Sequence, residues 1–233
     1  MDADLDGFTL CASMADLSRE PAARDRADAV EFRMDLADEP TADLESYDGE
    51  LPIVVTNRAE WEGGEAEDLG RYDELTDAAA HDAVVAVDIE LSALRGNAPE
   101  GEQPHAVALR ETAREKGVTV IASVHDFEST PSSGVLVELL ADAATEGDVA
   151  KFATTAEGRA DALAMLSATH RATAAGHDVA TMCMGEAGRH TRAVTPLYGS
   201  LIGYAPVDTE EATAPGQYDL ASLRSLLDGL GVE

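Results

Sequence analysis

The stretch TVIASVHDFESTPSSGVLVELLADAATEGDVAKFAT, residues 119–154, contains the unit from which the fold can be predicted. Its two ends, TVIASVH (119–125) and VAKFAT (149–154), are short apolar runs typical of buried strands, and residues 132–147 between them have helical character. A strand, a helix and a second strand in this order predict two parallel strands joined by a crossover helix. This part of the chain therefore predicts an α/β protein.

Similar apolar runs recur on both sides of this unit, which makes eight candidate strands in all. They are FTLCAS (8–13), AVEFRMD (29–35), PIVVTNR (52–58), VVAVDIE (84–90), TVIASVH (119–125), VAKFAT (149–154), VATMCMG (179–185) and LIGYAP (201–206). Segments with helical character lie between several of these runs and after the last one, and they end in glycine as helices often do. They are HAVALRETAREKG (105–117), SSGVLVELLADAATEG (132–147), AEGRADALAMLSATHRATAAG (156–176) and DLASLRSLLDGLG (219–231). In the last segment Leu220, Leu223, Leu226 and Leu227 form an apolar stripe that we expect to pack on the core.

Eight strands that alternate with helices over 233 residues predict a compact (β/α)₈ barrel, with residues 1–233 as one catalytic domain. The competing hypothesis is a doubly wound open sheet. No glycine-rich phosphate loop follows the first candidate strand, which weakens a nucleotide-binding interpretation of that kind.

The chain is strongly acidic, with 46 Asp and Glu against 16 Lys and Arg and a formal net charge of −30. Such a charge makes nucleic acids and anionic membranes poor partners. An acidic surface with only two lysines, Lys116 and Lys151, resembles that of proteins from halophilic organisms that accumulate salt. We also expect a cytoplasmic protein, because the acidic opening MDADLDG is unlike a signal peptide and no apolar stretch approaches the roughly 20 residues of a membrane span.

Lys151 is the more informative of the two lysines, because it lies within the apolar run VAKFA. Burying an ammonium group is unfavourable unless the group is paired or its pKa falls. A lysine in its free amine form is the nucleophile that forms a Schiff base with a ketone. Lys151 is therefore a candidate catalytic nucleophile.

Charged residues alternate with apolar ones in the second candidate strand, where Glu31, Arg33 and Asp35 are separated by Phe32 and Met34. If Phe32 and Met34 face the helices, the three charges face the barrel interior, where they must be paired or functional. The alternative is a half-exposed edge strand with its polar face in water.

Polar residues also occur at the ends of other candidate strands, and in a barrel these carboxyl ends converge on the active-site face. We expect one cavity to be surrounded by Glu31, Arg33, Arg58, Glu90, His125 and Lys151. Asp88 and Glu90 also have a structural interpretation, as partners of neighbouring arginines, and a lone histidine is more often structural than catalytic. His125 differs from the other histidines because it precedes the strand that carries Lys151, where an imidazole could move protons next to an imine. The sequence contains no metal-binding motif, and we expect neither a metal nor a cofactor.

Six motifs in order along the chain resemble the type I 3-dehydroquinate dehydratases. They are EFRMD (31–35), TNRAEWEGGE (56–65), SVHDF (123–127), KFA (151–153), MGEAGRHTR (184–192) and ATAPGQ (212–217). The resemblance covers nearly the whole chain. It implies a (β/α)₈ barrel, often dimeric, that dehydrates 3-dehydroquinate to 3-dehydroshikimate through a lysine Schiff base, in the shikimate route to aromatic amino acids.

The resemblance also implies roles for individual residues. Lys151 matches the imine-forming lysine, His125 the general acid and base, and Glu62 a carboxylate that orients the ring of the histidine and balances its charge. The implied substrate-binding residues are Glu31 and Arg33 for hydroxyl groups, Arg58, Arg192 for the carboxylate, Met182 and Met184 as walls, and Thr213 and Gln217 on a closing loop. Better-known bacterial members of the family usually have serine at the position of Thr213, and the hydroxyl group is retained here.

Two other functions compete with this one. The first is a Schiff-base aldolase that acts on a sugar phosphate, although Arg192 and ATAPGQ favour a carboxylate over a phosphate ligand. The second is a barrel that has lost catalysis and serves as a binding or assembly module, against which the intact Lys151, His125 and Arg192 argue.

The acidic composition makes a prediction about stability. We expect the melting temperature to rise with KCl concentration, because the Debye length falls to about 3 Å at 1 M salt and repulsion within the net charge of −30 is then screened. Thermal unfolding followed by circular dichroism in KCl from about 0.1 M upward measures this dependence. A melting temperature that does not rise would contradict salt adaptation.

Overall fold

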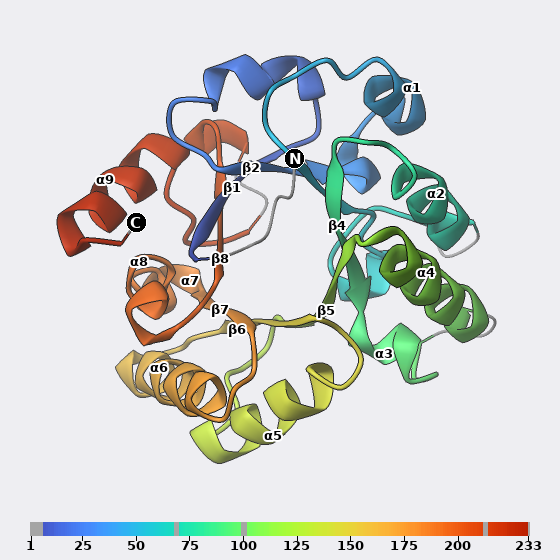
Figure 1. The fold of residues 1–233 in the computed structure, drawn as a ribbon. Coiled ribbons are helices and arrows are strands. Elements are labelled where there is room, and N and C mark those ends of the chain that lie inside the picture. The colour runs from blue at the N-terminus through green and yellow to red at the C-terminus, as the bar shows by residue number, and fades with distance from the viewer. Residues whose placement is uncertain (1–6, 68–69, 99–101, 212–213, 233) are drawn as a thin grey trace.

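The computed structural model describes residues 7–67, 70–98, 102–211 and 214–232. In this part of the chain, eight parallel strands form one sheet that curls into a barrel, with helices around its outside (Figure 1). The strands are β1 (Thr9–Met14), β2 (Ala29–Arg33), β3 (Ile53–Thr56), β4 (Val84–Glu90), β5 (Thr119–Asp126), β6 (Val149–Thr155), β7 (Val179–Met184) and β8 (Ile202–Pro206). All eight candidate strands are confirmed. The second is shorter than expected, because Met34 and Asp35 belong to the 3₁₀ helix η2 (Met34–Leu36).

The order of the strands in the sheet is β7-β6-β5-β4-β3-β2-β1-β8, so the last strand pairs with the first. This pairing excludes the doubly wound open sheet. β7 and β8 are joined by hydrogen bonds near their amino ends. There the backbone N–H of Leu201 donates to the carbonyl oxygen of Val179 at 2.7 Å, and the N–H of Thr181 donates to the hydroxyl of Ser200 at 2.9 Å. The sheet is therefore a nearly closed barrel, as expected from the alternation of strands and helices.

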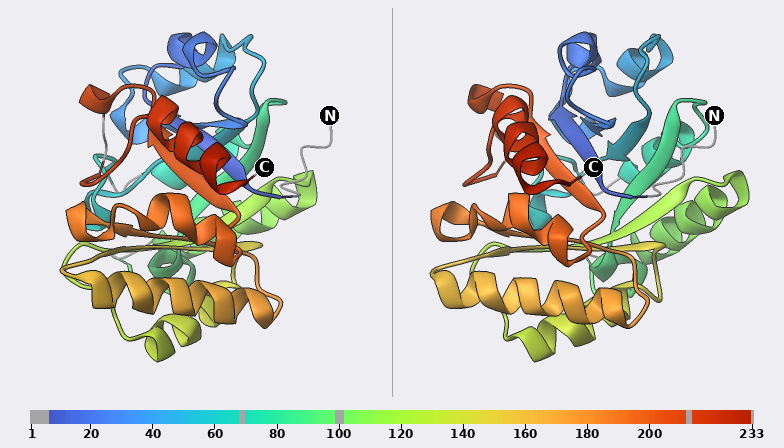
Figure 2. Two further views of the ribbon diagram at one scale, coloured as in Figure 1. Left: turned by 90° about the vertical axis from the view of Figure 1, so that its left-hand side faces the viewer. Right: turned by 60° about the vertical axis from the view of Figure 1, so that its left-hand side comes forward.

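Longer helices cover the second half of the barrel, whereas short helical turns follow the first strands. The α-helices are α1 (Pro40–Glu45), α2 (Arg71–Ala78), α3 (Leu91–Leu94), α4 (Glu102–Lys116), α5 (Ser133–Ala143), α6 (Arg159–Ala174), α7 (Gly185–Gly188), α8 (Thr191–Val194) and α9 (Leu220–Leu230). The other 3₁₀ helices are η1 (Leu17–Ala22), η3 (Glu60–Glu62), η4 (Thr195–Tyr198) and η5 (Thr209–Glu211). The side views show α6 running along the outer face of the sheet (Figure 2). No helix in the described ranges combines the length and the apolar character needed to cross a membrane.

The four predicted helical segments correspond to α4, α5, α6 and α9. The predicted stripe on α9 is correct for Leu220, Leu223 and Leu227, which are buried. It is wrong for Leu226, which is 41% exposed. Successive residues of a helix are about 100° apart, so Leu226 points about 120° away from Leu220. The core-facing stripe is therefore narrower than the leucine pattern indicated.

The sheet has one apolar layer on its outer face and another inside the barrel. The outer layer, between strands and helices, contains Phe32 and Met34 of the EFRMD motif, as expected if the charged residues face inward. β2 is paired with β1 on one side and β3 on the other, so the edge-strand interpretation is wrong. The inner layer consists mainly of small and β-branched side chains: Cys11, Ala29, Val54, Ala86, Ile121, Val149, Ala180 and Ile202. Beyond this inner layer, toward the carboxyl ends of the strands, the barrel contains charged side chains. These side chains form the site.

Candidate active site

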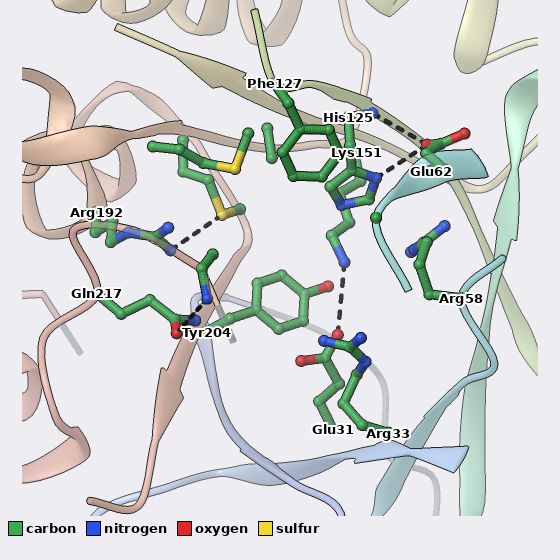
Figure 3. A pocket seen from close by; sticks show the side chains of 15 residues that line it. Glu31, Arg33, Arg58, Glu62, His125, Phe127, Lys151, Arg192, Tyr204 and Gln217 are labelled. Carbon is green, nitrogen blue, oxygen red and sulfur yellow. Dashed lines mark hydrogen bonds and ion pairs between the residues drawn. The ribbon is translucent and has the colours of Figure 1, made fainter. Parts of the chain in front are cut away.

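A cavity opens at the carboxyl ends of the strands. Its lining comprises Glu31, Arg33, Arg58, Glu62, Gly63, His125, Phe127, Lys151, Ala153, Met182, Met184, Arg192, Tyr204, Ala214 and Gln217 (Figure 3). The structure thus brings together the candidate residues that it describes, with one exception. Glu90 was expected at the cavity and does not line it.

Lys151 lies on β6 with its side chain inside the barrel, and only 4% of the residue is exposed. Its Nζ donates to Oδ2 of Asp88 at 2.8 Å and is 3.6 Å from Oε1 of Glu31. Nζ also lies 4.1 Å from the centre of the Tyr204 ring, where the negative face of the aromatic system attracts a cation. Two carboxylates and an aromatic ring therefore surround Nζ of Lys151.

Asp88 connects the lysine to the rest of the buried charges. Its Oδ1 accepts from Arg58 at 2.6 Å and from the hydroxyl of Ser123 at 2.5 Å. Burial alone would raise the pKa of Asp88, but the positive charges of Arg58 and Lys151 outweigh it and hold the pKa well below its usual range. The predicted structural pairing with an arginine is confirmed, and Asp88 in addition contacts the lysine directly.

Glu90 does not line the cavity, and its carboxylate is bound by other groups. Oε1 is 3.0 Å from Arg58, and Oε2 accepts from Arg71 at 2.8 Å and from the hydroxyl of Tyr72 at 2.9 Å. Arg71, which is 2% exposed, is also paired with Glu102 of α4 at 3.0 Å. The structural interpretation of Glu90 is therefore correct, and its expected place in the cavity wall is wrong.

His125 is held at the end of β5 by Glu62. Oε1 of Glu62 accepts from the backbone N–H of His125 at 3.0 Å and lies 2.9 Å from Nδ1 of the ring. With the Nδ1 proton directed at Glu62, Nε2 is left as a base that can face the cavity. Phe127 is stacked beside the ring, with 6.2 Å between centroids. Gly63, with φ of +82°, ends η3 directly after Glu62, where a Cβ would meet the ring of Phe127.

The environment of this pair favours a neutral imidazole. Burial, followed by the positive charges of Arg58 and Lys151, lowers the pKa of His125 well below 6.5. Burial raises the pKa of Glu62 to about 8, and the carboxylates of Glu90 and Asp88 add to this effect against the opposing charge of Arg58. His125 is therefore ready to accept a proton near neutral pH.

Glu31 and Arg33 reach the cavity from β2. Glu31 accepts from the hydroxyl groups of Ser13 at 2.5 Å and Thr56 at 3.3 Å, which fixes its carboxylate near Lys151. Arg33 donates to both oxygens of Asp35, at 2.8 and 2.6 Å. Asp35 thus acts as the partner of Arg33 and does not line the cavity.

Arg192 differs from the other two arginines of the cavity. It lies on α8 after β7 and is 5% exposed, and no carboxylate within the described residues pairs with it. One guanidinium nitrogen donates to the sulfur of Met182 at 3.5 Å, and its Nε is buried without a partner. Burial lowers the pKa of Arg192 to about 10, so the group is a cation at neutral pH. A buried cation of this kind is a site for an anionic ligand.

Met182, Met184 and Gln217 line the cavity as expected. Oε1 of Gln217 accepts from the backbone N–H of Ala214 at 3.1 Å, and the N–H of Gly185 donates to the carbonyl of Pro215 at 3.0 Å. The second of these bonds holds Pro215 against the residue that follows β7. Thr213 lies outside the described residues.

Four residues at the site had no assigned role in the sequence prediction of the substrate pocket: Asp88, Ser123, Phe127 and Tyr204. Side chains two residues apart on a strand point to the same face, so the position of His125 could have placed Ser123 inside the barrel. The position of Ile202 could have placed Tyr204 there in the same way. It could not show which atoms they contact.

Comparisons with known proteins agree with this geometry. The family model described as type I 3-dehydroquinase matches residues 11–233. The chain is 57% identical to a 3-dehydroquinate dehydratase of Haloarcula marismortui, over 97% of this chain and 98% of that protein. It is 51% identical to the enzyme of that name from Halobacterium salinarum, over 96% and 97% of the two chains. Both relatives come from halophilic archaea, in agreement with the composition.

Among solved structures, 3-dehydroquinate dehydratase from Geobacillus kaustophilus superposes with a TM-score of 0.81, at 27% identity over 97% of this chain and 92% of that one. The fold, the cavity and the sequence matches lead to one conclusion. The chain belongs to the type I 3-dehydroquinase family.

Proposed function

We propose that the protein dehydrates 3-dehydroquinate to 3-dehydroshikimate through a Schiff base on Lys151. The observation that carries this proposal is the arrangement of three side chains around one cavity (Figure 3). Lys151 is a buried amine, His125 is a neutral base on the adjacent strand, and Arg192 is a buried cation without a carboxylate partner among the described residues. A keto acid with hydroxyl groups complements all three.

The ligand is held by charge and by hydrogen bonds. Arg192 binds the substrate carboxylate, for which the planar fork of a guanidinium group is suited. Glu31 and Arg33 bind hydroxyl groups on the side of β2, with Arg58 behind them. Met182 and Met184 form an apolar wall. Gln217 closes over the ligand together with Thr213.

The reaction begins when the amine of Lys151 attacks the C3 ketone. Loss of water gives an imine, which becomes a cation when protonated and makes the neighbouring C2–H more acidic. His125 removes that proton to give an enamine. The enamine expels the C1 hydroxyl group, which leaves as water after it takes a proton from the same histidine. Hydrolysis of the imine then releases the product from Lys151.

Glu62 has a positioning role in these steps. In the ligand-free protein the imidazole is neutral, so Glu62 orients the ring through Nδ1. When His125 takes the substrate proton, the ring becomes a cation, and this positive charge favours the ionised form of Glu62, whose carboxylate then balances it. General acid–base catalysis of this kind contributes about 10²- to 10⁴-fold to the rate.

The net charge of −30 opposes the approach of an anionic substrate at low salt. At the molar salt of a halophilic cytosol this long-range field is screened within about 3 Å. Attraction then depends on contact with the cavity arginines. The cytoplasmic location, the place in the shikimate pathway and the assembly as a homodimer are further parts of the proposal. The pathway and the homodimer rest on the family resemblance.

The first prediction concerns the nucleophile. Lys151→Arg is expected to fold and to abolish turnover, because a guanidinium group does not lose its proton to form an imine. Sodium borohydride added with 3-dehydroquinate should inactivate the wild type and add ligand mass to the peptide that carries Lys151. The matched control is Lys116→Arg at the exposed end of α4, which should retain wild-type activity and trapping.

The same trapping experiment separates the competing functions. Trapping of sugar phosphates alone would favour the aldolase, and no trapping of either ligand would favour a binding module. Appreciable dehydratase activity in Lys151→Arg would refute the role of Lys151.

The second prediction concerns the carboxylate clamp. Arg192→Ala is expected to raise KM sharply, to lower kcat and to reduce kcat/KM by on the order of 100-fold, since a charge-assisted bidentate contact is lost. The melting temperature of the ligand-free variant should not fall, because an unpaired buried charge is removed. Arg189→Ala, on a half-exposed neighbour, is the control and should leave KM unchanged. Steady-state kinetics with an unchanged kcat/KM in Arg192→Ala would contradict the clamp.

The third prediction concerns pH. The neutral form of His125 is the active base and its pKa is lowered, so the acid limb of kcat/KM should lie below pH 6.5. A further change near pH 8 should accompany ionisation of Glu62. In Glu62→Gln the acid limb should remain, the change near pH 8 should disappear, and kcat should fall about 10-fold. Glu60→Gln, on the exposed side of the same turn, should behave as wild type. An acid limb above pH 6.5 would show that the environment of His125 has been misjudged.

A further inference from the structure

Tyr204 lines the cavity from β8, and neither the motifs nor the proposed catalytic steps involve it. Its side chain points into the barrel like that of Ile202, and the residue is 4% exposed. Its ring lies between Arg192 on one side and Lys151 on the other, with the hydroxyl end toward Lys151 and Glu31 (Figure 3).

The hydroxyl oxygen of Tyr204 is buried and has no hydrogen-bond partner among the described residues. Leaving a buried hydroxyl unpaired destabilises a folded protein, and a phenylalanine would fill the same space without that penalty. The neighbouring groups do not supply a partner. Lys151 donates to Asp88, and Glu31 accepts from Ser13 and Thr56. The hydroxyl is therefore available to a ligand.

The other donors near the lysine are already engaged. Arg33 is bonded to Asp35, and Arg58 is bonded to Asp88 and to Ser123. Burial, together with the charges of Cys11 and Glu31, raises the pKa of Tyr204 well above its ordinary value, so the phenol keeps its proton at neutral pH. Near the amine, Tyr204 thus offers a neutral O–H donor.

The position of this donor relative to the amine defines what it can contact. The amine of Lys151 lies over the ring face at 4.1 Å. When Nζ attacks a ketone carbon, the ketone oxygen is only one bond from that carbon. The ketone oxygen is then close enough for the hydroxyl group of Tyr204 to contact it. In the proposed complex, a carboxylate held by Arg192 would lie toward the other side of the ring (Figure 3).

We propose that the hydroxyl group of Tyr204 donates a hydrogen bond to the ketone oxygen of the carbon that Lys151 attacks. In this step the nitrogen lone pair forms the C–N bond, and the π pair of the carbonyl moves onto the oxygen. The phenol stabilises the negative charge that develops there and keeps its own proton. The oxygen takes up the two protons that the attacking nitrogen loses, its bond to carbon breaks, and it leaves as water when the imine forms. This inference rests on the proposed function and adds to it a donor for the first covalent step.

The test is Tyr204→Phe, with Tyr47→Phe as the matched control. Tyr47 does not line the cavity, and its hydroxyl donates to the carbonyl of Leu51 at 2.7 Å. Protein and 3-dehydroquinate are mixed, quenched with borohydride after increasing times, and analysed by mass spectrometry for adduct on Lys151. We expect the rate of adduct formation in Tyr204→Phe to fall by between about 10- and 100-fold. The ligand-free melting temperature of this variant should be unchanged or higher.

The control should show the opposite pattern. Tyr47→Phe loses a hydrogen bond that is made in the free protein, so its melting temperature should fall while adduct formation stays at the wild-type rate. An adduct rate in Tyr204→Phe within twofold of wild type would overturn the inference and leave the proposed function intact. Absence of any adduct in the wild type would instead overturn the proposed function, and the role of Tyr204 with it.

Discussion

The site depends on a chain of buried ion pairs that runs from the helix layer into the barrel. It links Glu102, Arg71, Glu90, Arg58, Asp88 and Lys151. Removing one member of such a chain would leave its partner as an uncompensated buried charge, which costs about 3–5 kcal/mol. The lysine can therefore be kept inside an apolar barrel because each successive charge is balanced by the next. The side chain of the proposed nucleophile is therefore fixed in position before any ligand arrives.

The same pairing decides which groups remain available to a ligand. Arg33 and Arg58 are neutralised by aspartates, so they shape the cavity more than they attract an anion from outside it. Arg192 and the hydroxyl of Tyr204 are left without such partners among the described residues. Unpaired buried polar groups are unfavourable in the free protein and become favourable contacts when a complementary ligand binds. The distribution of paired and unpaired groups thus describes the expected ligand: anionic at one end and a ketone at the other.

The strong acidity of the chain and the cationic character of its site are compatible because they occupy different regions. The net charge of −30 is a property of the whole molecule, and its field is screened at high salt. The cavity charges lie within a few ångströms of one another in a buried setting, where salt screens them far less. Adaptation of the surface to salt can therefore proceed without altering the chemistry inside the barrel.

The sequence by itself determined the barrel and most of the site. Apolar runs separated by helical segments suffice for parallel strands, and the carboxyl ends of parallel strands meet on one face, so His125 and Lys151 could be predicted as neighbours. Only the tertiary structure decided how the charges are shared. Glu90 proved to be bound by Arg71, a residue from a different element, and not to line the cavity, and Asp88 proved to contact Lys151. Periodicity specifies which way a side chain points, whereas a contact also depends on the register between strands and on the packing of the helices around them.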